Sequence, residues 1–212
     1  MGIIERNQKL TNVKKNDIID GMEKVLLSKT YDRLTIDDVA KEAEYSKKTI
    51  YSYFTSKDEL YMELLIRKFD MLFEALKCAV DGSEKRGMEK IKELGKVYYK
   101  FANEFPEYMQ AIINFETKQE SEELDKSQLF ERFNKETGKS FVLLEEAIKE
   151  GIADNAIPPE TDVVSAAILL WSNITGFIML AYKKGAYIQN YYHKSLDELF
   201  DYNMEMILRS FI

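Results

Sequence analysis

The sequence predicts an all-α protein, and three observations lead to this prediction. Only 9 glycines and 3 prolines occur among 212 residues, too few chain breakers for the many turns of an all-β fold. Apolar residues recur at helical spacing in one segment after another. A hydroxyl residue precedes three of these segments as a candidate N-cap, at Thr35, Ser46 and Ser56. We expect about nine helices in total.

The first helix is expected over residues 14–28, where Ile18, Met22 and Val25 form an apolar stripe. The dozen residues before it show no such periodicity, and we expect a loose arm there. A second, short helix follows Thr35, and its inward stripe includes Ile36 and Val39.

A third short helix is expected between Ser46 and Phe54, with Ile50 and Phe54 four residues apart on its inner face. Its outer face then carries cations, hydroxyls and an aromatic ring, from Lys47, Lys48, Tyr51 and Ser52. Such a face suits a DNA groove, because lysine neutralises phosphate and hydroxyls donate to phosphate oxygens. On these residues alone, an ordinary solvated helix face remains an equal alternative.

Longer helices are expected in the rest of the chain. One begins at Ser56, where Glu59 completes a capping box. Others are expected near residues 86–103, 106–117, 124–153, 160–184 and 195–211. Gly185 is expected to end the helix over 160–184.

The segment from Val163 to Tyr182 contains no charged residue over a length that spans a bilayer. Polar residues within it, among them Asn173, weaken a membrane interpretation. We therefore expect a soluble helix that is buried on two faces, with the core on one side and a partner subunit on the other.

Charge is distributed unevenly along the chain. The formal net charge is −7, but residues 1–57 hold 11 Lys and Arg against 9 Asp and Glu. A weakly basic N-terminal part joined to an acidic body is compatible with DNA binding, since only the contacting face must be positive.

The sequence gives little support to an enzyme, a metal site or secretion. Cys78 and His193 are single in the chain, and no Cys, His and acid cluster is visible. We expect no catalytic residues, no metal and no cofactor. The lone cysteine and the polar N-terminus favour a cytoplasmic protein.

Three motifs within residues 18–61 resemble the N-terminal signature of the TetR family. They read Thr-Ile-x-x-Val-Ala at 35–40, Ser-Lys-x-Thr-Ile-Tyr-x-Tyr-Phe at 46–54, and Ser-Lys-x-x-Leu at 56–60. The resemblance implies a helix-turn-helix DNA-binding domain in residues 1–57. A larger helical domain for ligand binding and dimerisation would follow in residues 58–212.

The resemblance also implies particular DNA contacts, to which we add Lys48. The candidates are Thr35, Ser46, Lys47, Lys48, Thr49, Tyr51, Tyr53 and Lys57. Lys47 and Tyr51 are expected to read base edges. Family members commonly have glycine where this chain has Thr30, Glu44 and Lys48, so Glu44 is expected to need an unusual backbone angle in the turn.

In this family the ligand pocket lies among the middle helices, and the last two long helices pair with those of a second subunit. The pocket candidates are Tyr98, Phe101, Met109, Ile112, Ile113, Phe115, Trp171 and Phe177. Any one of these residues also suits a plain apolar core. The candidates for the dimer interface are Leu169, Leu196, Leu199, Phe200, Asn203, Met206 and Ile207.

Together with these patterns, the resemblance implies a homodimeric, cytoplasmic transcription regulator without a membrane partner. We expect a repressor that a small apolar or aromatic effector releases from a near-palindromic operator in double-stranded DNA. The alternative is a helical adaptor that binds another protein and uses the three-helix unit only as a scaffold.

Overall fold

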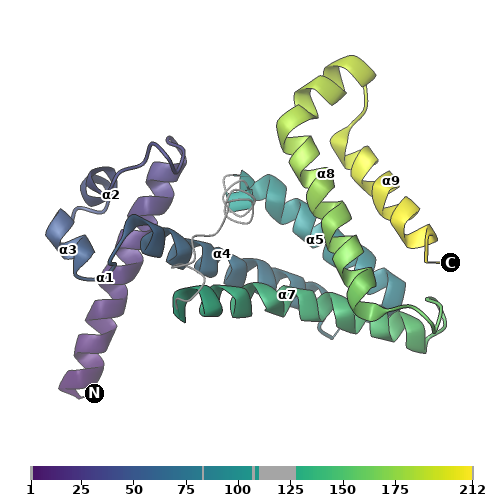
Figure 1. The fold of residues 1–212 in the computed structure, drawn as a ribbon, viewed down its shortest axis with the longest axis horizontal. Coiled ribbons are helices and arrows are strands. Elements are labelled where there is room, and N and C mark those ends of the chain that lie inside the picture. Colours follow the sequence, from purple (N-terminus) through teal and green to yellow (C-terminus); the bar gives the residue numbers. More distant parts are fainter. Residues whose placement is uncertain (1, 83, 107, 110–127, 212) are drawn as a thin grey trace. The chain divides into compact units, whose positions relative to one another are not determined.

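The computed structural model describes residues 2–82, 84–106, 108–109 and 128–211, and it confirms the all-α prediction. The helices of these residues are shown in Figure 1: α1 (Ile3–Leu26), α2 (Ile36–Glu42), α3 (Lys47–Tyr51), α4 (Lys57–Val80), α5 (Gly87–Glu104), α7 (Gln128–Ala153), α8 (Val163–Tyr192) and α9 (Leu196–Arg209). Most of the helix expected over 106–117 lies outside the described residues.

The chain divides into two compact units. Among the described residues, the N-terminal unit contains 2–68 and 128–134, and the C-terminal unit contains 69–82, 84–106, 108–109 and 135–211. Both α4 and α7 contribute residues to each unit. The domain boundary expected between residues 57 and 58 falls at the first residue of α4, and it stays a prediction.

The N-terminal unit has a core built from the residues that the helical spacing placed inward. Ile18 and Met22 of α1, Val39 of α2, and Ile50 and Phe54 at α3 are buried. Helix α1 packs against α2, and α2 packs against α3 (Figure 1). This packing fixes the orientation of α3, the shortest of the described helices.

Gly21 allows the close approach of α1 to the end of α2. A Cβ atom at this position would lie 2.7 Å from the Cβ of Ala43 and 3.1 Å from its backbone nitrogen. Atoms cannot remain so close, so a side chain here would push the two helices apart. Glycine is thus required inside a helix, where it normally costs stability.

The N-terminal arm differs from the prediction. The chain is helical from Ile3, and the Gly2 backbone N–H donates to Glu5 Oε2 at 2.9 Å, which caps the helix. Residues 5–10 are exposed, so this part of α1 buries no apolar stripe. Sequence periodicity detects burial, and for that reason it missed a helix that is solvated on all sides.

Charged contacts join α1 to the first half of α4. Arg67 donates to Asp20 and to Glu23, each at 2.5 Å, and Lys68 Nζ lies 2.9 Å from the second carboxylate oxygen of Glu23. The side chain of Lys68 is only 5% exposed. A buried ammonium needs such a partner, because an unpaired charge in apolar surroundings is costly.

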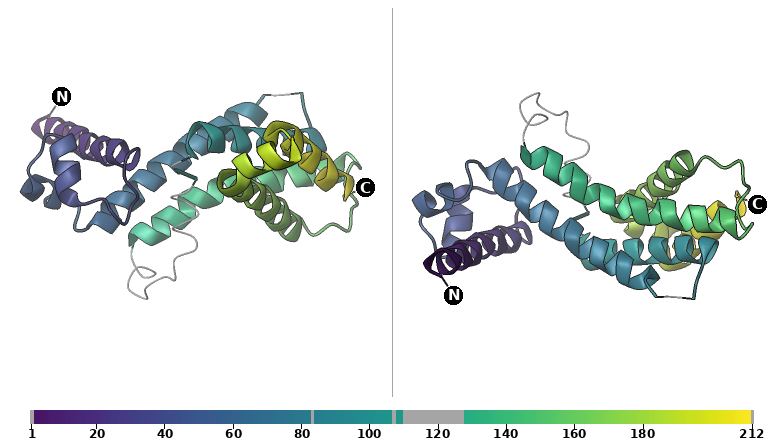
Figure 2. Two further views of the ribbon diagram at one scale, coloured as in Figure 1. Left: turned by 90° about the horizontal axis from the view of Figure 1, so that it is seen from above. Right: turned by 90° about the horizontal axis from the view of Figure 1, so that it is seen from below.

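The C-terminal unit is centred on an aromatic cluster where α5, α8 and α9 meet. The ring of Tyr99 stacks on Phe200 with centroids 4.1 Å apart, and Phe177 packs edge-on to Phe200 at 5.6 Å. The Tyr99 hydroxyl donates to Asp197 Oδ1 at 2.9 Å, so its polar end is also satisfied. Helix α9 folds back along α8, as Figures 1 and 2 show.

Helix α8 continues past Gly185, where the sequence predicted its end. Gly185 is buried, and a Cβ atom there would lie 2.9 Å from Leu196 Cδ1. Its role is therefore close packing of α8 against the start of α9. The helix ends instead at His193, whose left-handed conformation (φ 53°) turns the chain.

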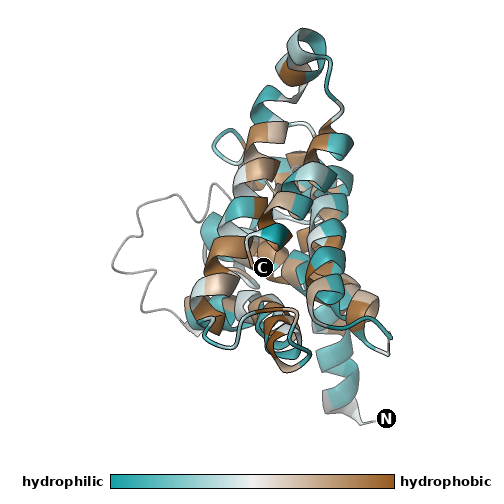
Figure 3. Cartoon of the chain, turned by 90° about the vertical axis from the view of Figure 1, so that its right-hand side faces the viewer, coloured by the Kyte–Doolittle hydropathy of each residue, from teal (hydrophilic) through white to brown (hydrophobic). Residues whose placement is uncertain are grey.

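One face of α8 packs inside the chain and another is left uncovered. The buried face includes Ala167, Leu170 and Ile174, whereas Leu169 is 68% exposed. Among the described helices, α8 alone is long and apolar enough to cross a membrane by length and composition, which is weak evidence for a span. Figure 3 shows hydrophobic turns along the α8–α9 pair, which rises to the top of the view.

The close contact at Gly21 leads to a prediction on stability. Gly21→Ala should lower the free energy of unfolding by about 1–3 kcal/mol, because the added methyl group overpacks the α1–α2 contact. Urea unfolding followed by circular dichroism measures the change.

Gly138 in α7 is the matched control, since a Cβ atom there meets nothing within 4 Å. Gly138→Ala should leave stability unchanged or raise it by up to about 1 kcal/mol, as expected for helix propensity alone. Equal effects at the two positions would refute the role assigned to Gly21.

Candidate DNA-binding surface

Helix α3 begins at Ser46, as the sequence predicted. Ser46 Oγ accepts the Thr49 backbone N–H at 3.0 Å and lies 2.8 Å from the Thr49 hydroxyl. Ile50 is buried beneath the helix, which leaves Lys47 and Lys48 exposed on the other side. This arrangement confirms the predicted inner and outer faces.

The aromatic candidates on this segment differ in exposure. Tyr51 is 48% exposed and lies on the outer face of α3. Tyr53, just beyond the helix, is half-buried. Tyr51 is thus the more accessible aromatic group for a DNA groove.

The turn between α2 and α3 depends on a left-handed residue. Glu44 has φ 58°, which confirms the unusual backbone angle expected at this position. This conformation costs a residue with a side chain about 1–2 kcal/mol. The Tyr45 backbone N–H donates to the Ala40 carbonyl at 3.0 Å, and its hydroxyl donates to Asp17 Oδ2 at 2.9 Å. The hydrogen bond to Asp17 raises the pKa of Tyr45 and ties the turn to α1.

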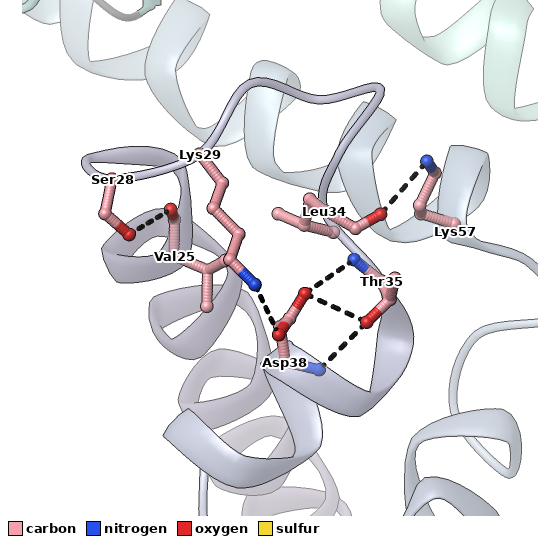
Figure 4. A network of polar contacts seen from close by, with 7 residues as sticks. All are labelled: Val25, Ser28, Lys29, Leu34, Thr35, Asp38 and Lys57. Carbon is pink, nitrogen blue, oxygen red and sulfur yellow. Dashed lines mark hydrogen bonds and ion pairs between the residues drawn. The ribbon is translucent and has the colours of Figure 1, made fainter.

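The start of α2 is held by the network shown in Figure 4. Asp38 Oδ2 accepts the backbone N–H of Thr35 at 3.0 Å and its hydroxyl at 2.9 Å. Lys29 Nζ lies 2.6 Å from the other oxygen, Asp38 Oδ1. Hydrogen bonds from Lys29 and then Thr35 lower the pKa of Asp38 to about 2. The carboxylate therefore stays ionised through the physiological range, and the capping box of α2 stays intact.

Lys57 holds the chain before α2 in place. Its ammonium donates to the carbonyls of Tyr31 at 3.1 Å and Leu34 at 3.3 Å, and it lies 4.1 Å from the centre of the Tyr31 ring. The Tyr31 hydroxyl in turn donates to Asp58. The ammonium has three N–H groups and these bonds use two, so a contact with DNA has only the third unless a bond is exchanged, and this candidate stays a prediction.

One charged residue next to the candidates was missed by sequence reasoning. Asp37 of α2 accepts from Lys47 Nζ at 2.9 Å, and this hydrogen bond raises the pKa of Lys47. The two residues are ten positions apart and on different helices, so no helical spacing relates them. Lys48 makes no ion pair within the described part of the chain.

The ligand candidates occupy several different environments. Phe101 and Met109 are buried, and the Tyr98 hydroxyl lies 3.4 Å from Thr175 Oγ1. Phe177 belongs to the aromatic cluster, whereas Trp171 is 42% exposed. Ile112, Ile113 and Phe115 lie outside the described residues. The structure therefore leaves the pocket as a prediction.

Two hollows are open to the surface of the C-terminal unit. One groove of about 440 Å³ runs between the start of α8 and the end of α9, with Leu169, Asn173, Ile207 and Phe211 in its wall. A second hollow of about 510 Å³ lies beside Lys184 and Tyr187 near the end of α8. Neither is lined by a predicted pocket residue.

Leu169 of α8 is exposed, and the interface candidates on α9 differ in exposure. Met206 is exposed, and Leu196, Leu199, Asn203 and Ile207 are half-buried. Phe200 is 2% exposed and belongs to the core of its own subunit, so it is unavailable to a partner. The structure adds Tyr202, which is exposed on α9 and whose place the apolar pattern did not reveal.

A pair of amides crosses the uncovered face of α8 and α9. Asn203 Nδ2 donates to Asn173 Oδ1 at 2.9 Å, which gives the polar group in the uncharged helix a partner. In the described ranges, no group of three or more His, Cys, Asp or Glu residues is placed to hold a metal.

Two family matches together cover most of the chain. Residues 18–64 match the family described as bacterial regulatory proteins, tetR family. Residues 91–207, more than half of the chain, match the tetracyclin repressor-like C-terminal domain. These matches favour a DNA-binding regulator over an adaptor.

Similar proteins agree with this assignment. A 69-residue segment is 29% identical to the HTH-type transcriptional regulator AlkX of Mycobacterium tuberculosis and covers 32% of this chain and 33% of AlkX. The fold is similar to the fatty acid degradation regulator FadR of Bacillus halodurans, with TM-score 0.71 and 19% identity over 91% of this chain and 97% of FadR. The same TM-score and identity relate it to FadR of Bacillus subtilis in complex with stearoyl-CoA, over 91% of this chain and 96% of that one. The chain belongs to the TetR family of bacterial transcriptional regulators.

Proposed function

We propose that this protein is a homodimeric repressor that binds a near-palindromic operator through α3 and leaves it when a small apolar effector binds. The observation that carries this proposal is the two-sided character of α3. Its inner residue Ile50 is anchored in the core, while Lys47, Lys48 and Tyr51 are presented to solvent. A short, rigidly held helix with such a face suits a major groove.

Two α3 helices would act together in a twofold dimer. The uncovered face of α8 supports this, because Leu169 is exposed on it and residues 163–182 contain no charge. A twofold interface brings identical patches together, so an uncharged patch avoids like-charge repulsion. Such a dimer would place its α3 helices about 34–36 Å apart, at successive major grooves.

The effector that we would test first is a long-chain fatty acyl-CoA. Two regulators of similar fold are named FadR, and one of them was solved with stearoyl-CoA. The aromatic and apolar residues where α5 and α8 approach each other, Tyr98 and Phe177 among them, suit an acyl chain. A ligand lowers operator affinity only to the extent that it favours the conformation that does not bind DNA.

The first prediction from this proposed function concerns DNA binding. Purified protein should enrich a near-palindromic motif from random duplex DNA, whereas the Lys47→Ala/Tyr51→Ala variant should not. Loss of a base contact costs about 1–3 kcal/mol of binding free energy. Loss of a phosphate contact reduces the slope of log binding constant against log salt concentration, here called the salt slope, by about 1 in magnitude. Sequencing of the selected duplexes and fluorescence anisotropy measure both effects.

Lys96→Ala, which removes an exposed lysine from α5, is the control for general charge. It should retain the enrichment and the affinity of the wild type. Failure of the wild type to enrich any sequence would contradict the proposal, provided that the protein is folded and free of bound ligand.

The second prediction concerns the effector. Stearoyl-CoA should weaken binding to the selected operator and raise the melting temperature, since ligands stabilise the state that they bind. Free coenzyme A and a short-chain acyl-CoA serve as controls that lack the apolar chain. An operator affinity that none of these compounds changes would argue against acyl-CoA, and other apolar compounds would then be screened.

The third prediction concerns assembly. Leu169→Glu should convert a dimer of 24.8 kDa subunits into a monomer, because it places a charge in the apolar face of α8. Light scattering after gel filtration, without detergent, measures the mass. Lys100→Glu on α5 is the control, and it should remain dimeric. A dimer that tolerates Leu169→Glu would place the interface elsewhere.

A further inference from the structure

The carboxylate of Asp37 lies at the candidate DNA-binding surface, where it meets one of the cations of α3. Asp37 Oδ2 is 2.9 Å from Lys47 Nζ, and this contact bridges α2 and α3. Both side chains are open to solvent, with Lys47 50% and Asp37 71% exposed. The pair is therefore accessible to DNA as a unit.

Asp37 takes no part in the hydrogen bonds that cap α2. Thr35 and Asp38 make those bonds, and Lys29 pairs with Asp38. Asp37 does lie in the first turn of α2, where a carboxylate stabilises a helix by about 0.3–1 kcal/mol at most. The fold thus depends little on this carboxylate, which leaves its contact with Lys47 as its main local effect.

The two lysines of α3, Lys47 and Lys48, therefore contribute unequally to the attraction between this surface and DNA. An exposed ion pair is worth about 0–1 kcal/mol, so Lys47 can exchange Asp37 for a DNA group. The carboxylate nevertheless remains within a Debye length of the bound duplex, about 10 Å at 0.1 M salt, and it repels phosphate. Lys48, which has no ion-pair partner within the described residues, supplies the uncompensated positive charge.

We propose that Asp37 is a specificity-determining residue: it weakens binding to duplexes in general and restricts Lys47 to sequences that offer a better partner. Guanine provides such a partner through its O6 and N7 acceptors, and the cytosine amino group can donate to Asp37 itself. Removing the carboxylate should increase affinity for unrelated DNA more than affinity for the operator. This inference rests on the proposed function, in which α3 contacts DNA.

The experiment compares Asp37→Asn with the wild type on two duplexes, the selected operator and a scrambled duplex of the same composition. At about 50 mM salt, Asp37→Asn should bind the scrambled duplex roughly three- to tenfold more tightly. Operator affinity should change less, so the ratio of the two affinities falls. Melting temperatures of the free proteins show whether the variant keeps its fold.

The matched control is Glu42→Gln, which removes a carboxylate from the last residue of the same helix. Glu42 pairs with Lys24 of α1 at 3.5 Å and makes no ion pair with α3 among the residues described. Glu42→Gln should leave the ratio of operator affinity to scrambled-duplex affinity unchanged. Equal changes in Asp37→Asn and Glu42→Gln would overturn the proposal and leave only a general effect of net charge.

A double-mutant cycle with Lys47→Ala tests the pairing itself. In the wild type, Lys47 must give up its contact with Asp37 to reach DNA, so Lys47→Ala should cost less operator affinity there than in the Asp37→Asn background. Lys48→Ala should lower the salt slope by about 1 in either background. Additive effects of Asp37→Asn and Lys47→Ala would contradict the pairing. If the wild type binds neither duplex, the proposed function fails, and this inference fails with it.

Discussion

The close contact between α1 and the end of α2 is the constraint on which the DNA-binding unit depends. Gly21 has no side chain, and Ala43 occupies the space that a side chain would need. With that distance fixed, the left-handed Glu44 directs the chain into α3, and Tyr45 secures the turn to Asp17 of α1. The orientation of α3 thus follows from backbone geometry at a few positions. The groove-facing side chains only occupy the surface that this geometry presents.

Much of the N-terminal unit was predictable from the sequence, because its signals are local. The caps at Thr35, Ser46 and Ser56 and the inward residues of α1–α3 were all predicted, and each depends on residues only three or four positions apart. Helix α3 itself is too short to show a period, yet its cap and its two apolar residues were sufficient. The start of α1 was missed because a solvated helix carries no apolar stripe.

The features that the sequence did not reveal depend on contacts between distant residues. Nothing in the order of residues shows that Asp37 meets Lys47, or that Lys57 bonds to the carbonyls of Tyr31 and Leu34. Helix α9 has apolar residues around more than one face, so sequence alone could not assign Phe200 to its own core and Met206 to the outside. Gly185 is another example, because glycine is favoured both where a helix ends and where two helices pack closely. Only the contact with Leu196 shows that close packing is its role here.

The charged contacts between α1 and α4 also limit how this protein can change over generations. The ammonium of Lys68 is buried and donates to Glu23, which also accepts from Arg67. Loss of Glu23 would remove one carboxylate partner from each of these two cations, at a cost of up to about 3 kcal/mol. Small domains have only about 5–15 kcal/mol of stability, so this one substitution would use a large part of it. A substitution at Glu23 therefore disturbs two cations of α4 at once, which makes this position less tolerant of change than an exposed carboxylate with one partner.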